Sequence, residues 1–103
     1  MKNCKPDHEK LQSAADMLRA VAHPVRLRMV QLLRKGHLTV GVLQARLGIS
    51  QSLTSQHLSI LKSAGIVKSD KIANACHYTV LNKEIFSLLD CLSRCHCQNE
   101  KKR

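Results

Sequence analysis

Three of the five cysteines of this 103-residue chain lie within seven residues near its C-terminal end, at Cys91, Cys95 and Cys97. Thiolates are soft ligands, so such a cluster favours soft cations and metalloids over Mg²⁺ or Ca²⁺. Three thiolates suit a three-coordinate trivalent arsenic or antimony centre, whereas a fourth ligand such as His96 would suit tetrahedral zinc or cadmium. The same thiols could instead form a reversible disulfide or polysulfide bridge. Both kinds of chemistry stay open.

Helix geometry limits what these thiols can do together. Cys91 and Cys95 are four residues apart, so on a helix they share one face with their Cβ atoms roughly 5–6 Å apart. Cys97 lies about 200° further round, and one ion cannot collect all three thiols from a straight helix. Either the helix ends near Arg94 and the tail folds back, or Cys97 comes from a second copy of the chain. Cys91 or Cys95 alone could also simply pack in a dimer seam.

The remaining cysteines and the histidines are expected to be structural or incidental. Cys4 lies in the terminal segment, where chains are usually poorly ordered, although it could add a ligand across a dimer. Cys76 is most simply a core residue of a β-strand. None of the six histidines forms a helical pair four residues apart.

Residues 50–67 carry a second kind of chemistry, since they predict a helix with an unusual outer face. Ser50 is a good N-cap, and Leu53, Leu58 and Leu61 can form an inward apolar stripe. The outer face then holds short uncharged donors and acceptors and no acid, which suits base edges and phosphate oxygens in a major groove. The predicted operator contacts on this helix are Gln51, Ser52, Thr54, Ser55, Gln56 and His57.

The segments on either side complete a DNA-binding unit. Thr39 can cap a helix over residues 39–47, and Gly48 permits a tight turn, which together predict a helix-turn-helix. From Ile66 onward the period changes to two, with strands over residues 67–72 and 76–80 and a turn at Asn74. This hairpin is either a basic wing or a small cover for the core, and an ordinary helical hairpin remains the alternative to the helix-turn-helix. The predicted phosphate contacts are Arg46, Lys62, Lys68 and Lys71.

The charge balance agrees with a polyanionic partner. The chain has 17 Lys and Arg against 7 Asp and Glu, a formal net charge of +10. Tyr78 and Phe86 are its only aromatic residues, which argues against recognition of single strands or RNA by base stacking. No acid pair and no nucleophile with a positioned base is evident, so an enzyme is not expected. No apolar segment approaches the roughly 20 residues that span a bilayer, so we expect a cytoplasmic protein with reduced thiols and no membrane partner.

These segments predict one mainly α domain over residues 1–103, in the order ααααββα, with a small β-hairpin. The first helix, over residues 7–21, and the last, which Asn82 can cap, both carry more apolar side chains than a small domain can bury. This surplus predicts a homodimer formed through the first and last helices. A protein-interaction module that uses these two helices without binding DNA is the alternative class.

Three blocks of sequence, at residues 22–33, 43–52 and 55–67, carry a resemblance to a known family. They begin Ala22-His23-Pro24, Leu43-Gln44-Ala45 and Ser55-Gln56-His57. In this order and at this spacing they resemble the ArsR/SmtB family of bacterial repressors, and the resemblance covers essentially the whole chain. It implies a winged helix-turn-helix homodimer that represses transcription from a double-stranded DNA operator. Such a dimer leaves the operator when an effector binds, and the family's effectors include metals, metalloids and reactive sulfur species.

This sequence lacks the ligand residues of two effector sites of that family at the matching positions. A Cys-x-Cys pair before the recognition helix is replaced here by Val40-Gly41-Val42, and the zinc-binding pattern of the last helix by Asp90-Cys91-Leu92 and His96-Cys97-Gln98-Asn99. The thiol cluster remains, so we expect release by a thiophilic inducer, most simply As(III) or Sb(III). A redox-responsive or persulfide-responsive repressor, or a cadmium or zinc sensor, is the alternative. The ligands expected for the inducer are Cys91, Cys95 and Cys97.

Overall fold

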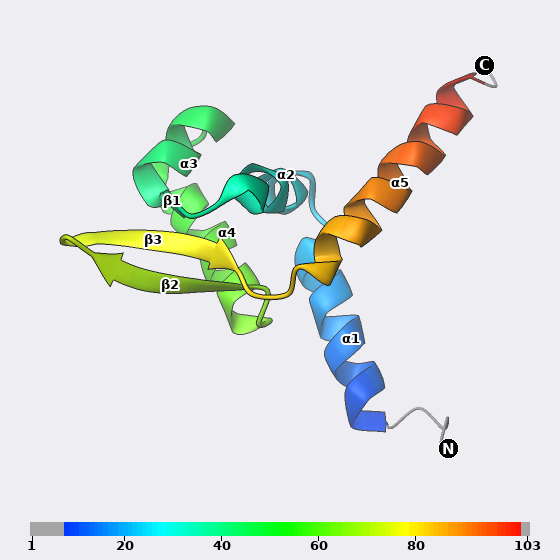
Figure 1. Cartoon of the computed structure of the whole chain (residues 1–103), viewed down its shortest axis with the longest axis horizontal. Helices are drawn as coiled ribbons and strands as arrows, with labels where there is room; N and C mark the ends of the chain where they lie inside the picture. The colour runs from blue at the N-terminus through cyan, green and yellow to red at the C-terminus, as the bar shows by residue number, and fades with distance from the viewer. Residues whose placement is uncertain (1–7, 102–103) are drawn as a thin grey trace.

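The structure is a computed structural model that describes residues 8–101 and the side chains of residues 8–94. It contains five helices, one 3₁₀ turn and a small three-stranded antiparallel sheet within that range (Figure 1). This architecture confirms the predicted winged helix-turn-helix with its mainly α content. The elements are α1 (His8–Val21), α2 (Pro24–Leu32), η1 (Leu33–Lys35), β1 (Leu38–Thr39), α3 (Val40–Leu47), α4 (Gln51–Ser63), β2 (Val67–Ile72), β3 (Ala75–Val80) and α5 (Glu84–Lys101).

Side-chain caps define the helix-turn-helix. The Thr39 hydroxyl accepts a hydrogen bond from the Val42 amide at 3.3 Å, and the Ser50 hydroxyl accepts one from the Leu53 amide at 3.1 Å. Each bond satisfies an amide that the first turn of a helix leaves without a partner. Gly48 has a φ of 70°, which glycine adopts without strain. The short turn between α3 and α4 therefore follows from local sequence, as expected.

The sheet has the order β1-β3-β2, with every pair antiparallel. Ala73 and Asn74, with φ values of 51° and 69°, connect β2 to β3. Positive φ at both central residues matches the twist of the flanking strands in a two-residue hairpin. The short strand β1, which the sequence did not predict, pairs Leu38 with Tyr78 and so attaches the hairpin to the helical body.

The core lies where α2, α3 and α4 meet the start of β2. Its fully buried side chains are Met29, Val30, Leu33, Leu43, Thr54, Leu58, Leu61, Ile66 and Val67. From α5, Ile85 and Leu89 are buried, whereas Leu92 is 51% exposed. Helices α1 and α5 thus join the core at one end, and both extend on the side of the molecule opposite the β2–β3 hairpin (Figure 1). No helix within residues 8–101 is long and apolar enough to cross a membrane.

Candidate nucleic-acid interface

Helix α4 presents a face of small, uncharged polar side chains to solvent. Gln51, Ser52, Ser55 and Gln56 are all exposed, and Ser59 extends the same surface by one turn. Hydroxyl and carboxamide groups both donate and accept hydrogen bonds, so this face can contact base edges as well as phosphate oxygens. Four of the six predicted operator contacts on this helix are therefore accessible to DNA.

Thr54 is a correction to the predicted set, because its side chain is fully buried. The Thr54 hydroxyl donates to the Ser50 carbonyl at 2.8 Å, so its polar group is satisfied within the helix. Leu53, expected inside, is instead 45% exposed. Thr54, Leu58 and Leu61 follow the i, i+4, i+7 spacing of one helix face, and this face packs on the core. The predicted inward stripe was therefore wrong by one residue at its first position.

His57 is half-buried and joins α4 to the other helices. The Arg26 guanidinium lies 3.1 Å from His57 Nδ1, and the rings of His23 and His57 have centroids 4.7 Å apart. His23 itself caps α2, because its Nδ1 accepts from the Val25 amide at 3.1 Å. Burial lowers the pKa of His57, and the nearby His23 and Arg26 lower it further. These contacts give His57 a part in positioning α4, and a DNA contact by this residue stays a prediction.

The four predicted phosphate contacts are all exposed: Arg46 at the end of α3, Lys62 in the last turn of α4, and Lys68 and Lys71 on β2. Lys68 lies 3.6 Å from Asp70, and such an exposed ion pair costs little free energy to separate. The prediction left out Arg28, which is also exposed and donates to the Arg46 carbonyl at 3.2 Å. Exposed basic side chains thus lie on the elements before and after the polar face, on the helix-turn-helix and on the hairpin.

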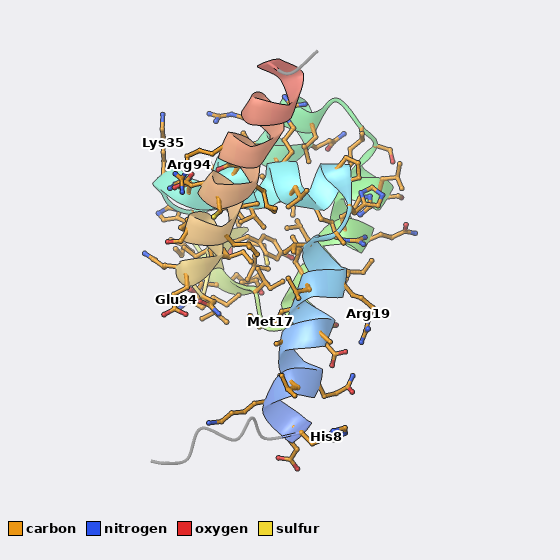
Figure 2. The ribbon with its side chains drawn as sticks, turned by 90° about the vertical axis from the view of Figure 1, so that its right-hand side faces the viewer. His8, Met17, Arg19, Lys35, Glu84 and Arg94 are labelled. Carbon is orange, nitrogen blue, oxygen red and sulfur yellow. The ribbon has the colours of Figure 1, made fainter. Side chains whose placement is uncertain are left out.

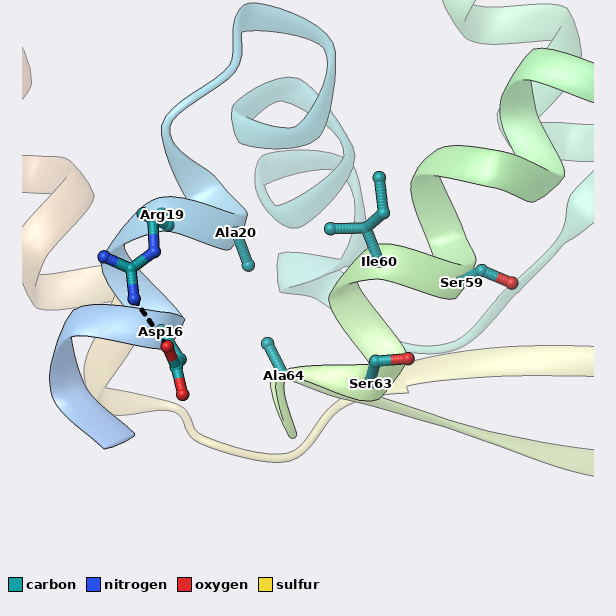
Figure 3. A pocket seen from close by; sticks show the side chains of 7 residues that line it. All are labelled: Asp16, Arg19, Ala20, Ser59, Ile60, Ser63 and Ala64. Carbon is teal, nitrogen blue, oxygen red and sulfur yellow. Dashed lines mark hydrogen bonds and ion pairs between the residues drawn. The ribbon is translucent and has the colours of Figure 1, made fainter. Parts of the chain in front are cut away.

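A groove lies between α1 and the C-terminal half of α4 (Figure 3). Asp16 and Arg19 form a 2.6 Å ion pair on its α1 side, and Ile60 forms part of its α4 side. Ser59 and Ser63 of α4 also line it. Gln51, Ser52, Ser55 and Gln56 are not among its lining residues, so the groove meets the exposed polar face of α4 only at Ser59.

Only part of the predicted thiol site can be placed. Cys91 is exposed on α5, whereas the side chains of Cys95 and Cys97 lie outside the described residues. Helix α5 continues to Lys101, so the alternative in which it ends near Arg94 is wrong. No group of three His, Cys, Asp or Glu side chains that could hold a metal is present among the described residues.

Cys76 is a second correction, since it is exposed and not a core residue. It pairs with Lys71 in the sheet, next to the turn of the hairpin. The hairpin extends beyond the helical body there, so no core lies beneath this part of β3.

Comparison with known proteins agrees with this geometry. The model of the family described as "Bacterial regulatory protein, arsR family" matches residues 23–69, which run from the N-cap of α2 into β2. The transcriptional activator HlyU of Vibrio cholerae is 38% identical over 85 residues, which cover 82% of this chain and 79% of HlyU. The chain belongs to the ArsR family. The biofilm growth-associated repressor of Xylella fastidiosa is 33% identical over 98 residues, 94% of this chain and 86% of the repressor.

A solved ArsR-family structure extends the agreement to three dimensions. The structure of reduced HlyU from Vibrio cholerae superposes on this chain with a TM-score of 0.75 at 35% identity. The superposition covers 86% of this chain and 94% of the HlyU chain. As a member of the ArsR family the chain is a DNA-binding transcriptional regulator, which confirms the prediction that it is not an enzyme. One of these relatives is named as an activator of transcription and the other as a repressor, so similarity to them does not by itself give the direction of regulation.

Proposed function

We propose that this chain is a cytoplasmic, homodimeric repressor that binds a double-stranded DNA operator through α4 and the β2–β3 hairpin. The observation that carries the proposal is the exposed polar face of α4, flanked by basic side chains on a chain of net charge +10. The polar groups of α4 can read base edges, and the cations on α3, α4 and β2 can neutralise phosphates. Occupation of an operator blocks transcription most simply by excluding polymerase, so a repressor needs no contact beyond this surface.

The exposed apolar side chains of α1 and α5 support the dimer. Leu11, Leu18 and Leu92 are each more than half exposed. An apolar hollow between α1 and the start of α5 is lined by Ala14, Met17, Leu18, Ile85 and Leu88, and Figure 2 shows Met17 and Glu84 on the two helices that border it. Burial of this surface against a second copy would place two α4 helices to read half-sites about 34–36 Å apart.

We further propose that the C-terminal thiols take the inducer. Cys91 and Cys95 share one side of the continuous helix α5, and Cys97 lies about 120° from Cys91. Helical spacing therefore gives one chain two cysteines on a shared face, and a three-thiolate set for As(III) or Sb(III) needs Cys97 from the second copy of a dimer. Cadmium or zinc would need a fourth ligand in addition. Such a site joins the two α5 helices, so occupancy would alter the spacing of the two DNA-binding faces, with a coupling of roughly 1–3 kcal/mol.

A thiol-redox or persulfide response is the second candidate. Cys91 is exposed, and Arg94 follows it by one helical turn. An exposed thiol is accessible to an oxidant or to a persulfide donor. That HlyU, a relative, is known in a reduced form favours this candidate too. If this candidate is correct, replacement of Cys97 alone should abolish the release of DNA by an oxidant, and arsenite should not release DNA from the wild-type protein.

Operator binding is tested by fluorescence anisotropy of the reduced protein on the DNA upstream of its own gene. If 6–10 phosphates are contacted, the affinity should fall by roughly 10³–10⁵ between 50 and 200 mM salt. Gln56→Ala should weaken binding, and Gln31→Ala, a change of the same side chain on exposed α2 surface, should not. A shallow salt dependence together with equal affinities of the two variants would contradict the proposal.

A further inference from the structure

Two histidines far apart in sequence meet at the edge of the sheet. His37 lies in the segment between η1 and β1, and His77 lies in the middle of β3. Their Nδ1 atoms are 3.0 Å apart, and their rings meet edge to face with centroids 4.8 Å apart. The pairing of β1 with β3 brings them together, since Thr39, two residues after His37, is the register partner of His77.

Both imidazoles are accessible and have an acidic neighbour. His37 is exposed and His77 half-buried, so water or an ion can reach the pair. Asp70 of β2 is the other register partner of His77, and cross-strand partners lie on the same face with Cβ atoms roughly 4.5–5.5 Å apart. The Asp70 side chain is 54% exposed and lies 3.6 Å from the Lys68 ammonium. An acidic side chain therefore lies on the same face of the sheet as the His77 ring.

We propose that His37 and His77 form a binding site for a borderline divalent cation, of which Zn²⁺ is the reference case. Two nitrogen ligands on a tetrahedral zinc ion, with bonds of about 2.0–2.1 Å, lie about 3.3–3.4 Å apart. The observed separation of 3.0 Å needs an adjustment of only a few tenths of an ångström. Imidazole is a ligand that zinc, copper and nickel prefer, and waters would complete the coordination.

Binding of the metal ion requires one proton to move within one of the two imidazole rings. Two neutral imidazoles whose Nδ1 atoms face each other form one hydrogen bond, in which one ring carries a proton on Nδ1 and the other accepts. A metal ion needs a lone pair on both Nδ1 atoms. The donor ring therefore moves its proton from Nδ1 to its solvent-facing Nε2, and no net proton is released.

The position of the site separates it from the α5 thiols and connects it to the hairpin. An ion held by both rings would tie the segment that leads into α3 to the strand that supports the β2–β3 hairpin. Thr39 caps α3 and is adjacent to His77 in the sheet. The ion would thus fix the hairpin relative to the helix-turn-helix. The inference depends neither on operator binding nor on a thiol-bound inducer.

The test records the imidazole ¹⁵N signals of the full-length reduced chain during a titration with Zn²⁺. These signals are resolved residue by residue, so zinc taken by cysteine thiols does not interfere. The His37 and His77 signals should shift together and saturate together, with both Nδ1 atoms as the metallated positions. In His37→Asn the His77 signal should no longer respond to zinc. Loss of an outer-shell partner typically lowers metal affinity by roughly 10–100-fold, and loss of a direct ligand should lower it by at least as much. His8→Asn, a matched change at an exposed histidine on α1, should leave the response intact.

Two results would overturn the proposal. The signals of His37 and His77 could stay unchanged at zinc excess, in which case the two rings form a hydrogen-bonded pair only. Alternatively, His77 could respond equally in wild type and His37→Asn, which would show that the rings do not share an ion. The backbone spectrum of each variant checks that the fold is retained, and His77→Gln repeats the test from the other ring.

Discussion

Arg34 binds Asp90 through two parallel hydrogen bonds, Nη1 to Oδ1 at 2.8 Å and Nη2 to Oδ2 at 2.7 Å. The same guanidinium lies 5.1 Å from the centre of the Phe86 ring. These contacts join η1, which follows α2, to α5 at the residue before Cys91. A movement of α5 around its thiols would therefore be transmitted to the DNA-binding half through this pair.

Replacement of Asp90 should weaken that transmission. In Asp90→Asn the paired charge is lost, so we expect an inducer to release less DNA than it does from wild type. The hydrogen bonds from Arg34 hold the pKa of Asp90 below its ordinary value of 3.8, against the opposing effect of burial. The pair therefore stabilises the fold above about pH 4, and this contribution is lost as the pH falls below that value. Urea unfolding between pH 3 and 6 should show a smaller decrease in stability with acid for Asp90→Asn than for wild type.

The matched control is Asp16→Asn, which breaks the exposed Asp16–Arg19 pair of α1. It should leave inducer-dependent release unchanged. Equal release by both variants and wild type would show that the Arg34–Asp90 pair is only a surface ion pair, whose typical contribution is small.

The pH dependence of stability should also depend on His57. Burial, together with His23 and Arg26, lowers the pKa of His57 below its ordinary value of 6.5. The unfolded chain therefore binds this proton more readily, so the stabilising effect of neutral His57 is complete above pH 6.5 and is lost as the pH falls through the lowered pKa. His57→Gln should flatten the pH dependence of chemical unfolding in this range. His8→Gln is the control, and an unchanged slope in His57→Gln would mean that the Arg26 contact does not favour the neutral ring.

Thr54 should behave as a core residue and not as a base contact. Thr54→Val keeps the shape but removes the hydrogen bond to the Ser50 carbonyl, so we expect a loss of about 1 kcal/mol in the free energy of unfolding. The preference among operator variants should not change. Ser55→Ala, at the adjacent exposed position, should show the reverse pattern. The preference is measured by anisotropy under conditions in which Thr54→Val is fully folded. An altered preference among operator sequences would contradict the placement of Thr54 in the core.

The apolar face of α1 should be required for dimerisation. Leu18 is 54% exposed in the single chain, so Leu18→Glu should leave the monomer folded but prevent its burial against a second copy. Sedimentation velocity should then show a monomer where wild type is a dimer. Gln12→Glu places the same charge on an exposed polar position of α1 and should remain dimeric. A dimeric Leu18→Glu would move the interface to another surface.

Local signals made the helix-turn-helix predictable. The caps at Thr39 and Ser50, and the left-handed turn at Gly48, depend on residues within a few positions of each other. The phase of α4 was predicted wrongly at its first inner position, because the sequence offers Leu53 for the inner face. The structure selects Thr54 instead, since a threonine hydroxyl can bond to the carbonyl four residues earlier and so tolerate burial.

Features that depend on distant parts of the chain could not be predicted. Strand β1 has two residues, too few to show alternation, and its pairing with β3 depends on the register of the whole sheet. The exposure of Cys76 depends on how far the hairpin extends beyond the body, and the contact of His37 with His77 follows from the same pairing. The positions of Arg34 and Asp90, 56 residues apart, likewise emerge only in the fold.

Control of operator binding by a metalloid at the α5 thiols is tested by titrating arsenite into the reduced protein bound to its own upstream DNA, with fluorescence anisotropy as the readout. The account predicts release of the DNA near one equivalent of arsenite per protomer, and loss of that response in Cys95→Ser with DNA affinity retained. Tight DNA binding that arsenite leaves unchanged in wild type, or release that is equal in Cys95→Ser, would contradict control of the operator by a metalloid at the α5 thiols.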